Sequence, residues 1–410
     1  MDTPTRRPRP ERLGRNVWAL SLIVFVAFVG FQFSSPFLPL FVAELGVTDP
    51  GQIALWSGLL SAITPAVSGA LAPLFGRLAD RFGRKAMLIR SLVAFTVIIA
   101  VMGLVRTVEQ LFVARLVQGF FAGFTPMAMA LASVSGPPER MAAAIGMVQS
   151  AQLLSVAVGP AVGGYVASHL GIRYAFFATA AFCTVALVGL IFLFEEVPAG
   201  GAGKSGKPVP RLPFRDVFRY PHFTIVMTLL LVAQFLDRGL ALLIPLEVAQ
   251  LPDVTAVAAT SGVIISVAAV VATLSANLAA RLSQGIPFGQ LLALGLVVGG
   301  PLCGAMALGH GWITLLVLRS LAALCLGGAM TLAYSLGGLI VPSENRGAAF
   351  GWLAFGVQIG GAASPLVTGA LAAISLPGAF VFYWALSWFA AALLAVGARD
   401  LWRRQQRLEG

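Results

Sequence analysis

The chain has 410 residues, of which 58% are apolar and only 10% are charged, and its mean hydropathy is +0.90. Soluble domains carry roughly a quarter of charged residues to cover their surface, so this composition excludes a soluble globular protein, and its hydrophobicity excludes a disordered chain. The net charge of +11 would suggest a nucleic-acid partner in a soluble protein, but here the basic residues lie between apolar blocks. An integral membrane protein remains.

Apolar blocks long enough to cross a membrane follow one another along the chain. One crossing needs about 20 mostly apolar residues. The first block is too long for the apolar part of a signal peptide and lacks a small-residue cleavage site after it, so we expect it to be retained. Blocks between charged or turn-rich breaks number twelve, at about 17–42, 53–75, 86–105, 110–132, 142–168, 175–194, 222–246, 259–281, 288–309, 311–336, 347–373 and 378–398.

Lysine and arginine lie almost entirely on one side of the predicted membrane. That side holds 22 of the 27, whereas the opposite loops hold only Arg106 and Arg173. The remaining three, Arg115, Arg238 and Arg319, lie within spans. Basic loops stay in the cytoplasm, so both termini are predicted to be cytoplasmic. The alanine- and glycine-rich usage favours a bacterial source and therefore a bacterial cytoplasmic membrane.

The sequence repeats itself at a shift of about 205 residues. The segment 39–45 is similar to 245–251. Two pairs of positions in the fifth and eleventh spans also match, Pro160 with Pro365 and Gly164 with Gly369. A six-helix unit used twice suits a transporter, because a site between two like halves opens to either face when the halves rock.

The repeat and the break between the two sets of spans define the predicted organisation. The break is rich in glycine, proline and basic residues, as expected for a linker. We predict a cytoplasmic tail (1–16), an N-terminal half (17–194), a cytoplasmic linker (195–221), a C-terminal half (222–398) and a second tail (399–410).

The segment between the second and third spans combines glycines, an acid and basic residues at fixed offsets. It runs from Gly76 to Lys85 and reads GRLADRFGRK. It resembles the signature loop of the major facilitator superfamily, and with the spans and the repeat the resemblance covers almost the whole chain. This implies an all-α membrane fold with twelve helices in two pseudo-symmetric halves. We expect Gly76 and Gly83 to permit a tight turn between antiparallel helices.

Within this segment, Asp80 is the expected gating residue, together with Arg81 and Arg84. Neighbouring guanidinium groups can donate charge-assisted hydrogen bonds to it. In the superfamily this acid holds the two halves together on the cytoplasmic side when the cavity faces outward, and the expected partner is the eleventh span near Gly347. A basic loop that only sets topology is the alternative. The matching position in the second half is Ala280, so such a latch would be one-sided.

Residues in the fourth span resemble the superfamily's proton-linked motif: Leu111, Arg115, Gln118, Gly119 and Gly123. An arginine inside a membrane is costly and marks a functional site by default. Two roles are open for Arg115, which are tuning a proton-carrying acid and bonding backbone carbonyls of the first helix.

The fifth span reads GPAVGG from Gly159 to Gly164, which resembles an element of exporters that exchange drugs for protons. Pro160 can kink the helix, and the three glycines allow close helix approach. The predicted gating residues of this element are Gly159, Pro160, Gly163 and Gly164. Ordinary small-residue packing is the alternative. The matching segment of the eleventh span, 364–369, keeps the proline and the last glycine but neither of the other two glycines.

Of the sixteen acidic residues, only Asp237 lies deep in a span, and Arg238 and Gly239 follow it. Desolvation favours the neutral form of a carboxyl group, which suits a residue that loads and releases a proton. We therefore predict proton coupling at Asp237, with Arg115 and Arg238 nearby. The alternative is a structural ion pair or hydrogen bond of Asp237 with Arg238, across a break at Gly239, or with Arg115 or Gln32.

Polar and aromatic side chains within spans are the substrate-site candidates, because polar groups in spans tend to face protein or water. An aromatic lining with few polar groups suits lipophilic compounds without strict selectivity. The predicted residues are Gln32, Phe33, Gln152, Gln234, Tyr334 and Gln358.

These motifs resemble those of twelve-span drug:proton antiporters, which implies export of lipophilic drug-like compounds in exchange for protons. We predict a monomer in the lipid bilayer, with a small-molecule substrate and a proton as partners and with no nucleic acid, cofactor or metal. Enzymatic motifs are not found in the sequence. A carrier of a small metabolite, such as a sugar or an organic anion, is the alternative, and sodium could replace the proton.

Overall fold

The computed structural model describes residues 10–135, 141–195, 220, 222–309, 311–341 and 346–397. These segments are helical with short connections, and no strand is assigned within them. Twelve stretches among them are long and apolar enough to cross a membrane, and their ends agree with the predicted limits within five residues. The predicted all-α membrane fold is confirmed.

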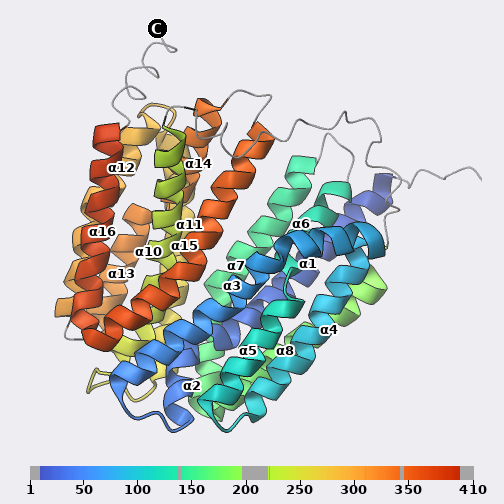
Figure 1. The fold of residues 1–410 in the computed structure, drawn as a ribbon, viewed down its shortest axis with the longest axis horizontal. Helices are drawn as coiled ribbons and strands as arrows, with labels where there is room; N and C mark the ends of the chain where they lie inside the picture. Colours follow the sequence, from blue (N-terminus) through green and yellow to red (C-terminus); the bar gives the residue numbers. More distant parts are fainter. Residues whose placement is uncertain are drawn as a thin grey trace, which may run out of the picture.

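Each half of the chain forms one bundle (Figure 1). The N-terminal bundle contains α1 (Pro10–Ser34), η1 (Ser35–Phe37), α2 (Leu38–Glu44), α3 (Pro50–Phe82), α4 (Arg84–Leu104), α5 (Val108–Phe121), α6 (Phe124–Val134), α7 (Met141–Leu170) and α8 (Ile172–Leu193). The C-terminal bundle contains α10 (Phe223–Val248), α11 (Val257–Leu282), α12 (Phe288–Ala305), η4 (Met306–Leu308), α13 (Trp312–Leu326), α14 (Ala329–Ile340), α15 (Arg346–Ile374) and α16 (Leu376–Gly397).

Three predicted spans are interrupted within the membrane. The first changes to a 3-10 turn at Ser35–Phe37, where Pro36 removes a backbone donor. The fourth breaks at Gly123, whose φ of +111° is left-handed, and the tenth breaks at Gly327. These two glycines are 204 residues apart, so the repeat places both breaks at equivalent positions.

The expected turn between the second and third spans is shorter than predicted. Helix α3 continues through Phe82 and α4 begins at Arg84, so Gly76 lies within a helix and the turn is made by Gly83 alone. Gly83 has φ +91° and ψ 149°, and its N–H bonds the carbonyl of Ala79 at 3.0 Å. The prediction of a turn at Gly76 is wrong, because a single left-handed glycine reverses the chain.

The two bundles are separate bodies that meet at one end. Each buries its own apolar core, one almost entirely from residues 223–394 and the other from residues 20–194. In Figure 1 the bundles converge at the lower end, where α15 ends and α3 begins, and diverge toward the upper end, where α10 and α15 begin. The upper end is the linker side, because α8 ends and α10 begins there.

A buried polar cluster ties α10 to α15 and α16 in the core of the C-terminal bundle. Ser364 donates to the carbonyl of Phe235 at 2.6 Å, and the hydroxyl groups of Thr368 and Tyr383 bond each other. The Tyr383 hydroxyl lies directly against Gly239, so a Cβ at this glycine would overlap it. A glycine is therefore required at position 239, two residues after Asp237 on α10.

We expect Gly239→Ala to destabilise the purified protein by about 1–3 kcal/mol, because an added carbon in a packed core forces its neighbours apart. Thermal melting followed by tryptophan fluorescence measures the effect. Gly146→Ala is the matched control, since nothing lies within 4 Å of a Cβ there. A melting temperature of Gly239→Ala equal to that of Gly146→Ala would contradict the expectation.

Candidate functional site

The predicted proton-coupling acid forms an ion pair with an arginine of another helix. Oδ1 of Asp237, on α10, lies 3.5 Å from Nη2 of Arg319, on α13. The side chain of Asp237 is 64% exposed, whereas that of Arg319 is 10% exposed. The carboxylate thus lies over a nearly buried guanidinium group and is open on its other side. The expectation that Asp237 is buried is wrong, because Arg319 covers only one side of the carboxylate.

The partner of Asp237 differs from the predicted alternatives. These were Arg238, Arg115 and Gln32, and the structure selects Arg319 instead. Adjacent residues of a regular helix point apart, and α10 runs unbroken from Phe223 to Val248, so Arg238 points elsewhere and is exposed. The repeat held the signal for this pair, since Arg319 stands 204 residues after Arg115.

Arg115 is poorly paired. Its Nη1 donates to Oε1 of Gln118, one turn later, at 3.4 Å, and its carbonyl accepts from Thr64 at 2.8 Å. Its Nε is buried and has no hydrogen-bond partner within the described part of the chain. Among the described residues, neither an acid nor a carbonyl of α1 contacts this guanidinium group. The structure therefore shows no partner for either predicted role of Arg115, which were tuning an acid and bonding carbonyls of the first helix.

The N-terminal substrate candidates differ in their surroundings. Gln32 is half-buried and packs against Gly159 of α7. Phe33 is only 3% exposed, and its ring lies 5.0 Å from that of Phe182 on α8, so it packs in the bundle rather than lining an open surface. Gln152 is half-buried, and its Nε2 has no hydrogen-bond partner among the described residues.

The C-terminal candidates come from three helices. Gln234 of α10 is half-buried and lies near Gly361 of α15. Gln358 is exposed on α15. Tyr334 of α14 stacks on Phe350 with ring centroids 5.9 Å apart and an angle of 9° between the planes. The two sets of candidates therefore belong to different bundles, and a shared substrate site requires that both face the space between them.

The GPAVGG element of α7 presents small residues to two neighbours at once. Residues four apart share one helix face. Gly159 and Gly163 face α1, where a Cβ on Gly163 would lie 2.5 Å from the Cα of Phe33. Pro160 and Gly164 face α11 of the other bundle. The element thus packs α7 inside its own half and joins the two halves.

The contact between α7 and α11 recurs between α3 and α15, and we call these two contacts the glycine seams. Both lie at the end away from the linker (Figure 1). In each seam, one glycine packs against the carbonyl of a proline and another against the carbonyl of an alanine. A Cβ added to any of these four glycines would lie closer than 3.0 Å to that carbonyl oxygen. The pairs are Gly262 on Pro160 and Gly164 on Ala258 in one seam, and Gly58 on Pro365 and Gly369 on Ala54 in the other.

The basic residues of the signature segment hold the linker side of the N-terminal bundle. Nη1 of Arg84 donates to the carbonyl of Ala130 at 3.0 Å, and the guanidinium of Arg81 lies 5.2 Å from the ring centroid of Phe82. The side chain of Asp80 lies outside the described residues. The end of α3 and the start of α15 diverge in Figure 1, so the latch stays a prediction.

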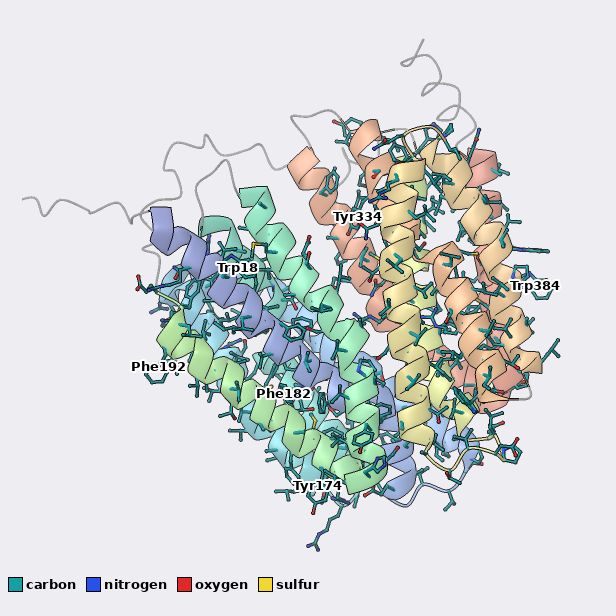
Figure 2. The ribbon with its side chains drawn as sticks, turned by 180° about the vertical axis from the view of Figure 1, so that it is seen from behind. Trp18, Tyr174, Phe182, Phe192, Tyr334 and Trp384 are labelled. Carbon is teal, nitrogen blue, oxygen red and sulfur yellow. The ribbon has the colours of Figure 1, made fainter. Side chains whose placement is uncertain are left out.

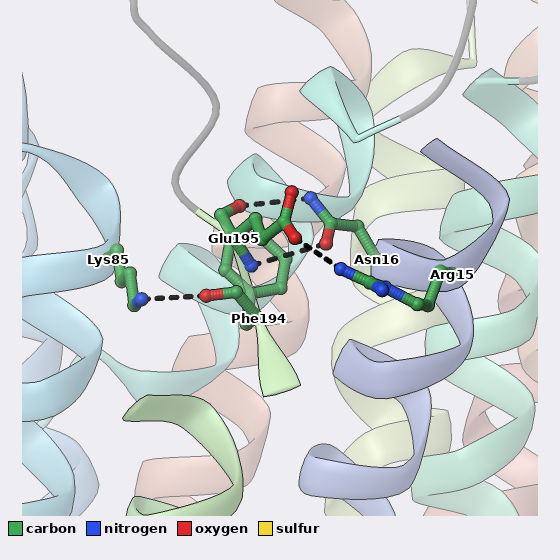
Figure 3. A network of polar contacts seen from close by, with 5 residues as sticks. All are labelled: Arg15, Asn16, Lys85, Phe194 and Glu195. Carbon is green, nitrogen blue, oxygen red and sulfur yellow. Dashed lines mark hydrogen bonds and ion pairs between the residues drawn. The ribbon is translucent and has the colours of Figure 1, made fainter. Parts of the chain in front are cut away.

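A polar network fixes the end of α8, where the linker begins (Figure 3). Nδ2 of Asn16 donates to the carbonyl of Glu195 at 2.9 Å, and the N–H of Glu195 donates to Oδ1 of Asn16 at 3.2 Å. Arg15 pairs with the carboxylate of Glu195, and Nζ of Lys85 donates to the carbonyl of Phe194 at 2.7 Å. The end of the N-terminal bundle is thereby tied to α1 and α4.

A groove of about 970 Å³ lies on the outside of the N-terminal bundle, between α1, α7 and α8. Its lining is mostly apolar and includes the exposed Trp18 and Phe192, which Figure 2 labels. None of the predicted substrate residues lines it.

Comparisons with known proteins agree with this architecture. The sequence profile of the Major Facilitator Superfamily matches residues 20–308. "Multidrug resistance protein MdtG" of Klebsiella pneumoniae (strain 342) is 30% identical over 369 residues, which cover 89% of this chain and 88% of the relative. The Salmonella typhimurium protein of the same name is 30% identical over 374 residues, which cover 89% and 90%.

Two solved structures show the same fold. A bacterial homolog to the human lysosomal transporter Spinster, in an inward-facing and occupied conformation, has a TM-score of 0.79 at 18% identity and covers 96% of this chain and 98% of its own. The nucleoside transporter NupG has a TM-score of 0.73 at 14% identity, with 93% and 99% covered. The chain belongs to the major facilitator superfamily of membrane transporters, as its signature segment and repeat predict.

Proposed function

We propose that this protein is a secondary active transporter that exports lipophilic drug-like compounds in exchange for protons. The observation that carries the proposal is the Asp237–Arg319 pair, the ion pair of an intramembrane acid that is open on one side. A carboxylate in this position can take up a proton and thereby weaken its attraction to the arginine. The names of the curated relatives support drug-like molecules as substrates.

Alternating access accounts for the two separate bundles. The excess of basic residues supports a cytoplasmic linker side. On this proposal, the conformation with closed glycine seams is open to the cytoplasm and receives substrate there. Closing the linker side, with Asp80 as the latch, opens the seams and releases substrate outside. A proton then enters from outside, binds Asp237, and leaves toward the cytoplasm after the reverse movement.

The polar side chains that the sequence singles out are the proposed substrate contacts. Gln32 and Gln152 contribute from the N-terminal bundle, and Gln234, Gln358 and Tyr334 contribute from the C-terminal bundle. Amide groups can donate and accept hydrogen bonds, which suits chemically varied substrates. We place the protein as a monomer in a bacterial cytoplasmic membrane.

The experiment that tests the proposal uses proteoliposomes with an imposed pH gradient and a panel of labelled lipophilic compounds. We expect the gradient to drive accumulation of at least one compound, and a protonophore that collapses the gradient to abolish this accumulation. Protein-free liposomes are the control. Uptake that is the same with and without the gradient would reject proton exchange, and no uptake of any compound would reject the drug-exporter assignment.

A further inference from the structure

The groove on the outside of the N-terminal bundle lies at the linker-side ends of three spans. Its lining comes from residues 15–25 of α1, 143–154 of α7 and 192–193 of α8. The three spans begin at Gly14, begin at Ala143 and end at Leu193. A groove with these walls begins at one surface of the membrane and runs into its apolar layer.

The groove forms because α1 and α7 pack closely over only part of their length. Oγ of Ser155 donates to the carbonyl of Phe25 at 3.0 Å, and beyond this bond the glycines of the GPAVGG element hold α7 against α1. Toward the linker side the two helices leave room, and nothing lies within 4 Å of a Cβ built on Gly146, which lines the groove.

The length of the groove matches one leaflet of a bilayer. From Arg15 to Phe25, α1 rises by about 15 Å, at about 1.5 Å per residue. The apolar core of a bilayer is about 30 Å thick, so one leaflet accounts for about half of it. An acyl chain that enters at the membrane surface would therefore reach the closed end of the groove at Phe25.

The lining is mostly apolar, and its charge is confined to the linker-side end. Arg15 is the one charged side chain among the described residues that line the groove, and Trp18 follows it within one turn of α1. Trp18 is exposed, as are Leu22 and Leu154 further along the groove. Tryptophan is enriched where a membrane meets water, so Arg15 and Trp18 mark the level of the lipid headgroups.

Positive charge exceeds negative charge at this end of the groove (Figure 3). Arg15 pairs through Nη2 with the carboxylate of Glu195, and Nζ of Lys85 donates to the carbonyl of the preceding residue, Phe194. Two cations thus accompany one anion in this network. A guanidinium group has five N–H donors, so its contact with one carboxylate leaves donors for a phosphate oxygen.

The C-terminal half is built without this pair of residues. The first and seventh spans match at a shift of 206 residues, which sets Pro221 against Arg15 and Thr224 against Trp18. The repeated helix therefore needs neither an arginine nor a tryptophan at these positions in order to fold.

A second apolar groove shows the opposite charge. It has a volume of about 610 Å³ and lies between α4 and α5. Among the described residues that line it, the charged one is Glu109, at the start of α5 and away from the linker side. A basic end is thus a property of the first groove and does not accompany every apolar groove of this bundle.

We propose that the groove between α1, α7 and α8 binds an anionic phospholipid of the linker-side leaflet. Its phosphate group contacts Arg15, and one acyl chain lies along α1 and α7. Basic pockets between helices on the cytoplasmic side of a membrane bind anionic headgroups, which agrees with the predicted orientation of the linker side. None of the predicted substrate or proton-coupling residues lines the groove, so the site stands independently of the proposed function.

Quenching of tryptophan fluorescence measures occupancy, because Trp18 lines the groove. The probes are phosphatidylglycerol and phosphatidylcholine with the same brominated acyl chains, titrated into the purified protein in detergent. The part of the quenching that Trp18→Phe removes belongs to the groove. We expect phosphatidylglycerol to bind about fivefold more tightly than phosphatidylcholine, because the choline cation offsets the phosphate charge.

Variants separate the charge from the ion pair and the headgroup from the chain. Arg15→Gln should lower the affinity for phosphatidylglycerol to that for phosphatidylcholine. Glu195→Gln breaks the same ion pair but keeps the arginine, so the preference for phosphatidylglycerol should persist or increase. Gly146→Phe fills the groove and should weaken both lipids, whereas Gly146→Ala should leave both affinities unchanged.

Four results would overturn the proposal. The two lipids could bind equally well, or neither could quench Trp18, which would leave the groove to another occupant such as detergent or the first residues of the chain. Glu195→Gln could abolish the preference as Arg15→Gln does, which would assign the effect to the ion pair. Quenching that is intact in Gly146→Phe would place the acyl chain outside the groove.

Discussion

Replacing Asp237 by asparagine is expected to reduce gradient-driven accumulation in proteoliposomes to the level of protein-free liposomes. Asparagine has nearly the same size as aspartate but cannot carry a proton, so the exchanged ion has no site. The carboxylate is 64% exposed and is therefore within reach of protons from solution, while Arg319 lies 3.5 Å away. The amide still accepts a hydrogen bond from this arginine, which keeps α10 and α13 together.

Downhill exchange separates loss of coupling from loss of folding. In Asp237→Asn we expect counterflow of labelled substrate between equal pH on both sides to persist, because this movement needs no proton. Asp253→Asn makes the same chemical change on the exposed connection after α10 and should leave both activities unchanged. Full gradient-driven accumulation in Asp237→Asn would move the proton site away from this residue.

The spans and the two halves could be predicted because they depend on local composition. A block of about 20 apolar residues must be helical in a bilayer whatever its neighbours are, since its backbone groups have no water to bond. The same local signals did not predict the interior breaks. Gly123 and Gly327 interrupt spans whose hydropathy is continuous, and only the repeat shows that the two breaks are equivalent.

The site could be predicted less completely, because its contacts join residues far apart in sequence. Asp237 could be singled out as the only acid deep in a span, but Arg319 is 82 residues away and its pairing depends on how α13 packs. Phe33 illustrates the converse error. Nothing in the sequence distinguishes it from the other 27 phenylalanines, and the structure places it in the packed interface of α1 with α8.

The glycine seams give the second large effect. We expect Gly164→Ala to reduce transport at least about tenfold, because the added Cβ would meet the backbone carbonyl of Ala258 at less than 3.0 Å. A backbone atom cannot turn aside as a side chain can, so α7 and α11 must separate. This separation favours the conformation that is open on the side away from the linker. Gly369→Ala should likewise separate α15 from α3 at the second seam.

Spin labels measure this separation directly. We expect Gly164→Ala to lengthen the distance between labels at Leu170→Cys and Thr255→Cys, which are exposed near the end of α7 and the start of α11. Gly146→Ala adds the same carbon to α7 in open space and should alter neither distance nor transport. Loss of transport with an unchanged distance would place the effect inside the N-terminal bundle. If either Gly164→Ala or Gly369→Ala lengthens the distance between helices at both seams, the two contacts open together. The repeat requires this of two halves that rock as rigid bodies.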